Sequence, residues 1–455
     1  MKLHGLHNRS TQVIFALLGS LFLVLPWYVI SHPAIPVALA LIPILIFVAL
    51  RYPFLMVLGF LIFSFFRIHE VFPQLYPLRI PQMLALGTIA SLAFNLMTKR
   101  IEVYWRSEFS IFCVFFILVT LGVFLATNRG EAMSSWSGTY VKIAIMVFAI
   151  SWLSQDTRAF KIMLYSILIA GLIVGYVTIY NKMNGIGLVE GTRATIGRDL
   201  GSLLGDPNDL ALVLLFPASF ALALVFTSGT GWGTKMLGVI CFITMISAII
   251  ATQSRGGLLG ITSVMAVFGY RKIKSKALFF SIGLICLMIL FAVAGISDRA
   301  SGGAHEAGID ESSMGRLHAW DAAIGMALSH PISGVGINNF LSNYYMYSDF
   351  WDGKNHAVHS TWFGVLAETG LIGFMIFISL IFTLIRNGLK TLQRLEKTDE
   401  VVANIVAYAV FAGLIGFCVS GTFLTMGFTW PVYILLSLGV AISRYSEKLV
   451  HQKKY

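Results

Sequence analysis

The sequence predicts an all-α integral membrane protein, a polytopic bundle of about 12–14 transmembrane helices with one long extracytoplasmic loop that contains short helices. Two observations predict this class. The chain is 57% hydrophobic and only 12% charged, about half the charge of an ordinary soluble domain. Apolar runs of roughly 17–25 residues recur along nearly the whole length, as expected for helices that cross a bilayer.

Each apolar run is bounded by charged, Pro or Gly residues, which places the ends of the predicted helices to within a few residues. The second and third runs have an alternative interpretation, because Arg51, Tyr52 and Pro53 between them also fit a re-entrant turn. The predicted cores are 12–30, 33–50, 53–67, 81–97, 109–126, 140–153, 160–180, 207–227, 235–252, 257–270, 277–296, 361–387, 401–421 and 427–443.

The net charge of +11 reflects membrane topology rather than nucleic-acid binding. Lys and Arg fall in short clusters between apolar runs, which is the pattern of cytoplasmic loops next to anionic lipids. With both termini in the cytoplasm, 21 of the 32 Lys and Arg residues lie on that side. No nucleic-acid partner is expected.

Under this topology three outward segments carry the polar chemistry: the loop 181–206, the turn 253–257 and the long loop 297–360. The domain division that follows is an N-terminal transmembrane bundle over 1–296, the long loop over 297–360, and C-terminal transmembrane helices with a cytoplasmic tail over 361–455. Within the loop, the pattern from Ser312 to Leu328 predicts a helix, and Gly334 and Gly336 predict a turn.

His359 is the leading catalytic candidate. It stands with Ser360 at the mouth of a predicted membrane helix, where an ionisable side chain marks a functional site. Imidazole can accept a proton at neutral pH, so a general base is the functional interpretation. The structural alternative is a histidine that caps the helix or hydrogen-bonds a lipid headgroup.

Arginines accompany this histidine on the outer side, where the positive-inside rule disfavours them. Arg193 and Arg198 lie in the loop 181–206, and Arg255 precedes Gly256 in the outward turn. Guanidinium groups bind phosphate oxygens in a fork, which points to a diphosphate ligand. The alternative is that each arginine reaches ordinary lipid headgroups.

Other polar residues have simpler explanations. Asp206 is expected to cap a helix that begins at Pro207. Glu368 is expected to orient a neighbour or pair with an arginine. His356 and His359 have the spacing of a zinc pair, with His305 and Glu306 as possible further ligands, yet no complete ligand set surrounds them, so no metal and no cofactor are expected.

The spacing of these residues resembles a known family. His359-Ser360, nine residues and then Gly370-x-x-Gly373 are similar to the signature of bacterial O-antigen ligases. Ser254-Arg255-Gly256 fits the same pattern. Residues upstream of His359 resemble the wider O-antigen ligase and polymerase superfamily. They are Arg316-x-x-x-Trp320-x-x-Ala323, His330-Pro331, Gly334-x-Gly336 and Phe340.

This resemblance implies a glycosyltransferase of C-type architecture in the bacterial inner membrane, with its active site at the periplasmic face. The donor is a glycan on undecaprenyl diphosphate, and the acceptor is a glycolipid (lipid A–core), a polysaccharide or a protein. His359 is the base, and Arg255, Arg316 and either Arg193 or Arg198 bind the diphosphate. Ser360, Glu368 and Gly370 support the site, and neither metal nor nucleotide sugar is used.

Three competing functions remain from the sequence. A polymerase of the same superfamily would use a lipid-linked glycan as both donor and acceptor, and a protein glycosyltransferase would use a protein acceptor. The Asp206–Asp209 patch and the long insertion before Arg316 are more like ligases of exopolysaccharide or protein, which departs from a lipid A–core acceptor. A polysaccharide or lipid transporter would instead need a polar path through the bundle.

Overall fold

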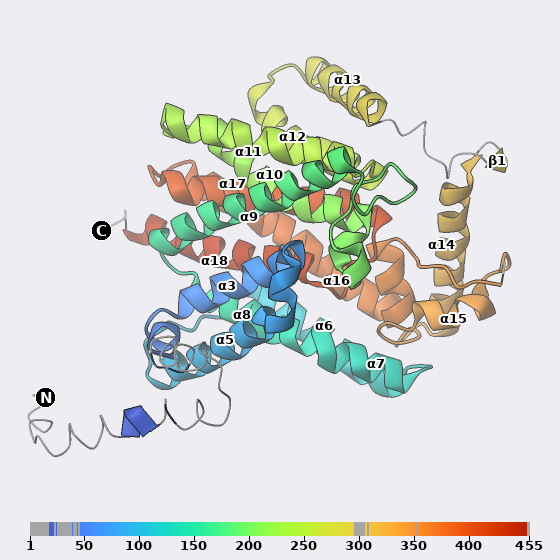
Figure 1. Cartoon of the computed structure of the whole chain (residues 1–455), viewed down its shortest axis with the longest axis horizontal. Helices are drawn as coiled ribbons and strands as arrows, with labels where there is room; N and C mark the ends of the chain where they lie inside the picture. The colour runs from blue at the N-terminus through green and yellow to red at the C-terminus, as the bar shows by residue number, and fades with distance from the viewer. Residues whose placement is uncertain are drawn as a thin grey trace, which may run out of the picture.

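The protein is an all-helical bundle whose long helices lie side by side (Figure 1). The computed structural model describes residues 18–21, 24, 39, 43, 46–294, 305–306, 309–351 and 353–452. Most of the first predicted helix core, 12–30, and most of the second, 33–50, lie outside these residues.

In the first half of the described chain, each long helix coincides with a predicted core. The helix predicted at 140–153 begins earlier, because α7 and a π-helical turn, η2, continue into α8. The elements are α3 (Pro53–Phe65), α4 (Ile68–Val71), η1 (Pro73–Leu78), α5 (Ile80–Met97), α6 (Ser107–Leu125), α7 (Arg129–Ser135), η2 (Trp136–Tyr140), α8 (Val141–Leu153), α9 (Thr157–Asn184), η3 (Arg198–Leu200), η4 (Leu203–Gly205), α10 (Pro207–Phe226), α11 (Trp232–Ala251), α12 (Arg255–Lys272) and α13 (Lys276–Val293).

The second half contains the predicted long loop and the last helices. The loop contains an antiparallel hairpin of two short strands, each of two residues, and two helices, of which the longer has 19 residues. The elements are β1 (His305–Glu306), β2 (Ile309–Asp310), α14 (Glu311–Ser329), α15 (Phe340–Tyr347), α16 (Thr361–Leu395), α17 (Val401–Ser420), η7 (Gly421–Phe423) and α18 (Trp430–Gln452).

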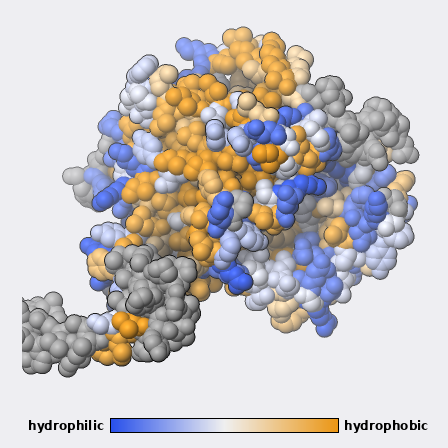
Figure 2. Space-filling model, viewed as in Figure 1, coloured by the Kyte–Doolittle hydropathy of each residue, from blue (hydrophilic) through white to orange (hydrophobic). Residues whose placement is uncertain are grey.

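Among the described residues, nine helices are long and apolar enough to cross a membrane. The predicted class, a polytopic all-α membrane protein, is therefore confirmed. The nine are fewer than the 12–14 expected, and the reasons can be located. Two predicted cores lie largely outside the described residues, α3 is short, and α12 and α18 form as predicted but fall outside this set of nine. Figure 2 shows apolar residues across the middle of the bundle and hydrophilic residues more often towards its ends.

The core is centred on α10, which is buried along nearly its whole length between α9, α11, α12 and α17. Small residues allow this close packing, as is usual between membrane helices. A Cβ added at Gly257 would lie 2.5 Å from Cβ of Ala211, and one at Gly260 would lie 2.5 Å from Cδ1 of Leu215. The glycines of α12 therefore bring its N-terminal half against α10.

The two ends of the bundle differ in their polar groups. At one end, here called the ion-pair end, Arg106 pairs with Glu447 at 2.8 Å and Arg444 pairs with Glu102 at 2.8 Å. At the other end, here called the His359 end, α10, α12 and α16 begin. Figure 1 places α7, α14 and α15 at the right, away from the C-terminus marked at the left.

The helices α14 and α15 pack against the start of α16 through a small core of their own. Its buried members include Ala319, Ala323, Val358 and Ala367. The helix predicted from Ser312 to Leu328 is present as α14, and its Ile324 is 40% exposed. This core fixes the segment that carries His359 against the bundle.

Candidate active site

His359 lies immediately before α16 in a left-handed backbone conformation, with φ of 43°. This conformation costs a residue with a Cβ about 1–2 kcal/mol, so the surrounding contacts must hold it. The next residue, Ser360, is buried and its Oγ accepts a hydrogen bond from the amide of Phe363 at 3.5 Å. On the other side, Nε1 of Trp320 donates to the carbonyl oxygen of Val358 at 3.1 Å. His359 is thus fixed from both flanks.

The start of α12 repeats this local structure. Gln253 is left-handed, with φ of 51°, and the buried Ser254 caps the helix by accepting a hydrogen bond from Gly257 at 3.1 Å. Arg255 is then the first residue of the helix. At α10, Asp206 caps the amides of Asn208 and Asp209, as predicted. Three helix N-termini, each with a partial positive charge, therefore belong to the same end of the bundle.

The turn η7 joins these elements. Its Phe423 packs so closely on α12 that a Cβ added at Gly256 would lie 3.1 Å from Cβ of Phe423. The guanidinium carbon of Arg316 lies 5.8 Å from the centre of the same ring. Thr361 Oγ1, two residues after His359, donates to the carbonyl oxygen of Leu424 at 2.7 Å. Arg255, Arg316 and His359 consequently converge around η7.

Arg193 forms part of the wall of this region. Its side chain is buried, its Nε donates to the carbonyl oxygen of Thr252 at 3.2 Å, and its Nη2 donates to Oδ1 of Asn208 at 2.8 Å. These bonds connect the loop 181–206 to the starts of α10 and α12. Arg193 is therefore close to the predicted site, with its guanidinium engaged by protein groups.

Arg198 is placed differently. It is exposed on η3, and its Nη1 donates to the carbonyl oxygen of Gly205 at 3.3 Å. Its loop is anchored to α4, where Ser202 donates a hydrogen bond to the buried carboxylate of Glu70. Arg198 thus lies at the surface of the His359 end rather than in the wall with Arg193.

Charges from three elements act on His359. Burial lowers the pKa of its imidazole below the ordinary 6.5, the positive charge of Arg316 lowers it further, and Asp206 raises it. His356 adds a smaller lowering effect. The side chain is consequently neutral at pH 7 and able to accept a proton.

Glu368 and Gly370 lie in α16 where the loop after α14 packs against this helix. The helix predicted at 361–387 is broken at Gly370, with φ of 69° and ψ of −171°, a conformation that favours glycine. The loop after α14 fills the break: Val335 N donates to the carbonyl oxygen of Ala367 at 2.9 Å, and Leu371 N donates to that of Pro331 at 2.8 Å.

The predicted turn at Gly334 and Gly336 exists, and both glycines have positive φ. Their close approach to α16 explains the need for glycine, since a Cβ on Gly334 would overlap the backbone at Glu368. Glu368 is buried and its carboxylate accepts a hydrogen bond from the amide of Phe340 at 3.3 Å. This contact connects Glu368 in α16 to the start of α15.

Several residues of the site were not found from the sequence. Phe423 contacts Arg316 from an ordinary apolar stretch, and Asn208, inside the Asp206–Asp209 patch, accepts a hydrogen bond from Arg193. The sequence carries one signal for the matching helix starts. In Gln253-Ser254 and in His359-Ser360, a polar residue and a serine stand directly before a helix. Among the described residues, no group of three or more His, Cys, Asp or Glu side chains could hold a metal ion.

Comparisons with known proteins agree with the resemblance stated from the sequence. Residues 240–378 match the family model described as O-Antigen ligase. This range includes Arg255, Arg316, His359 and Gly370, and it excludes the arginines of the loop 181–206.

A curated relative matches a longer segment. The exopolysaccharide production protein ExoQ of Rhizobium meliloti (strain 1021) is 26% identical over 233 residues, which make up 47% of this chain and 51% of ExoQ. The chain thus spans about half the length of the curated relative that it matches.

Proposed function

Because residues 240–378 of this multi-pass membrane protein form an O-antigen ligase family domain, we propose that the chain is a glycosyltransferase of lipid-linked glycans. It transfers a glycan from undecaprenyl diphosphate to an acceptor hydroxyl and inverts the anomeric centre. The observation that carries the proposal is the convergence of His359, Arg255 and Arg316 around η7.

His359 is the proposed general base. The acceptor oxygen attacks the anomeric carbon from the face opposite the lipid diphosphate, and its proton moves to the imidazole as the new bond forms. The bond from the anomeric carbon to the diphosphate oxygen breaks and leaves undecaprenyl diphosphate. A base that is neutral at pH 7 suits this step, and burial together with Arg316 keeps the pKa of His359 below its ordinary value.

Arg255 and Arg316 are the proposed ligands of the departing diphosphate. Negative charge grows on its oxygens in the transition state, and fixed cations with helix N-termini stabilise that charge. Arg198, exposed at the surface of the His359 end, is proposed to meet the donor there, and Arg193 to hold the wall in place. Neither a metal nor a cofactor is needed for these steps.

The proposed site faces the periplasm from the bacterial inner membrane, and both termini lie in the cytoplasm. The distribution of Lys and Arg in the sequence supports this orientation. The ion-pair end, with Arg106, Arg394 and Arg444, would then meet the cytoplasmic leaflet. The domain limits 1–296, 297–360 and 361–455 belong to the same proposal.

The acceptor is proposed to be a polysaccharide in preference to lipid A–core or a protein. The similarity to a relative named for exopolysaccharide production supports this choice. The second candidate function is a polymerase, in which a lipid-linked glycan is both donor and acceptor, since such an enzyme would also make a polysaccharide.

One experiment separates these functions. Purified protein in lipid nanodiscs is incubated with an undecaprenyl-diphosphate glycan, with and without a polysaccharide acceptor, and products are resolved by mass. Transfer that requires the acceptor indicates a ligase, and chain growth without it indicates a polymerase. Movement of intact donor across the bilayer with no new glycosidic bond would contradict both and favour a transporter.

A further inference from the structure

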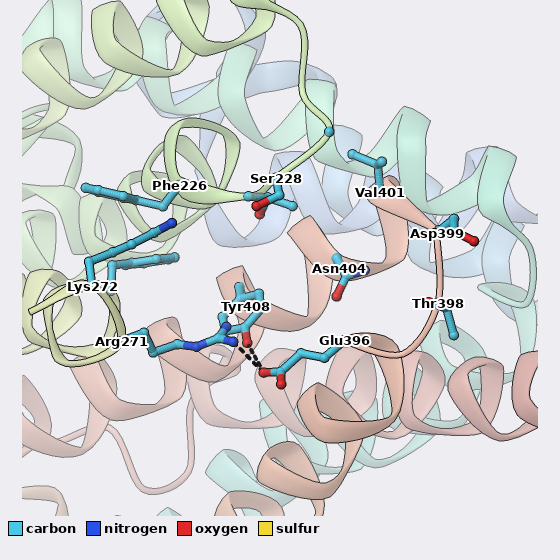
Figure 3. Close-up of a pocket in the computed structure, with 13 residues that line it drawn as sticks. Phe226, Ser228, Arg271, Lys272, Glu396, Thr398, Asp399, Val401, Asn404 and Tyr408 are labelled. Atoms are coloured by element: carbon cyan, nitrogen blue, oxygen red, sulfur yellow. Dashed lines mark hydrogen bonds and ion pairs between the residues drawn. The ribbon is translucent and has the colours of Figure 1, made fainter. Parts of the chain in front are cut away.

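A polar cavity lies at the ion-pair end, opposite the proposed active site. Its volume is about 520 Å³, and it is formed where α10 and α12 end and α17 begins (Figure 3). The ends of three helices place it at the expected boundary of the membrane. Its lining residues are Phe226, Thr227, Ser228, Gly229, Phe268, Arg271, Lys272, Glu396, Thr398, Asp399, Val401, Asn404 and Tyr408.

The carboxylate of Glu396 is already neutralised within the cavity wall. Arg271 forms an ion pair with it, and the hydroxyl of Tyr408 donates to the same oxygen at 2.8 Å. The guanidinium carbon of Arg271 also lies 4.3 Å from the centre of the Tyr408 ring. Figure 3 shows this group on one side, with the carboxylate of Asp399 turned away from the other labelled side chains.

Other polar side chains of the lining carry hydrogen-bond donors for an anion. In Figure 3 the ammonium group of Lys272 points towards Phe226 and Ser228. Thr227 Oγ1 is buried and has no hydrogen-bond partner among the described residues. A phosphate oxygen in the cavity would satisfy such donors.

Apolar and basic groups extend this site towards a membrane surface. The rings of Phe226 and Phe268 stack with centroids 5.7 Å apart and form one wall, and Val401 adds an apolar side chain on the other side of the cavity (Figure 3). The turn from α12 to α13 adds Lys274 and Lys276, both exposed, so that four cations occupy positions 271–276. A basic pocket between membrane helices with an apolar wall matches an anionic lipid.

We propose that this cavity binds the phosphate headgroup of an anionic phospholipid. Lys272 and the hydroxyls of Thr227 and Ser228 bind the phosphate, and the Phe226–Phe268 wall packs against the first part of the acyl chains. A free phosphate shares the polar contacts but makes no use of the apolar wall.

The test measures lipid retained by the purified full-length protein in native mass spectrometry. Protein is supplied with phosphatidylglycerol, with phosphatidylcholine, or with phosphatidylglycerol and excess inorganic phosphate. Lys272→Gln is compared with Lys161→Gln, which removes an exposed lysine from α9 at the same end. We expect phosphatidylglycerol to be preferred, and Lys272→Gln to reduce its retention about fivefold while Lys161→Gln leaves it unchanged.

Three results would overturn the proposal. Equal retention of the two lipids would remove the preference for an anion, and equal losses in the two variants would assign the effect to general surface charge. Displacement of the lipid by inorganic phosphate alone would assign the cavity to free phosphate. Lys272→Arg, which keeps the charge, is expected to restore retention and excludes misfolding as the cause.

Discussion

The indole Nε1 of Trp320 donates a hydrogen bond of 3.1 Å to the carbonyl oxygen of Val358, the residue immediately before His359. The ring of Trp320 also stacks on Phe363, with centroids 4.9 Å apart and planes at 16°. Trp320 therefore connects α14 with Val358, immediately before the proposed base, and with Phe363, whose amide Ser360 caps. It is a positioning residue for His359.

Trp320→Phe is expected to keep the stacking and lose the hydrogen bond. Because one such bond contributes about 1 kcal/mol, we expect kcat to fall about fivefold, with KM for the donor unchanged. Steady-state transfer kinetics measure both constants. Trp136→Phe is the matched control, since it removes an indole hydrogen bond of 3.0 Å to Thr120, between η2 and α6. A larger effect on KM than on kcat would argue against positioning.

The acid limb of the pH profile should respond in opposite directions to two charge changes. His359 must be neutral to accept a proton, so activity is lost as pH falls through its pKa. Arg316 lowers this pKa and Asp206 raises it. Arg316→Gln should therefore move the limb of kcat/KM to higher pH, and Asp206→Asn, which still caps α10, should move it to lower pH. Shifts in the same direction would contradict the assignment of the limb to His359.

Arg255→Gln is expected to reduce kcat about 100-fold, because a fixed donor to the leaving diphosphate is lost in the transition state. Arg255→Lys should recover part of the rate, since it restores the charge without the planar fork. Arg129→Gln, which removes an exposed arginine from α7 at the same end, serves as the control. An equal loss of kcat in Arg129→Gln would mean that Arg255 acts only through the overall positive charge of that surface.

Gly370→Ala should destabilise the fold by at least about 2 kcal/mol. The added Cβ would lie 2.6 Å from the carbonyl oxygen of Pro331, and the backbone conformation itself favours glycine. Thermal unfolding in detergent measures the change. Gly283→Ala in α13 is the control, because nothing lies within 4 Å of its added Cβ. An unchanged unfolding midpoint in Gly370→Ala would mean that the break in α16 is not required.

The sequence predicted most helices because their signals are local. Long apolar runs, together with Asp206 before Pro207, placed α10 and its cap correctly. The break at Gly370 was not predicted, since glycine is common in membrane helices and the run stays apolar across it. What defines the break is a set of hydrogen bonds from the loop near Pro331, about 40 residues earlier in the chain.

For the site too, local signals could be predicted from the sequence and tertiary contacts could not. Arg255 and His359 were predicted because charge is rare in outward apolar segments. Their convergence could not be predicted, because it depends on Phe423 and on close packing at Gly256. The engagement of Arg193 by Asn208, which distinguishes it from Arg198, is likewise a tertiary contact.

The most direct test of the central claim is glycan transfer by His359→Asn. Asparagine tolerates the left-handed conformation at this position but cannot act as the base. With saturating lipid-linked donor at pH 7.5, we predict a fall in the transfer rate of about 100-fold or more, with unchanged donor binding. His451→Gln, at the exposed end of α18, should leave the rate unchanged. Transfer by His359→Asn at a rate near that of the natural protein would contradict the role of His359 as general base.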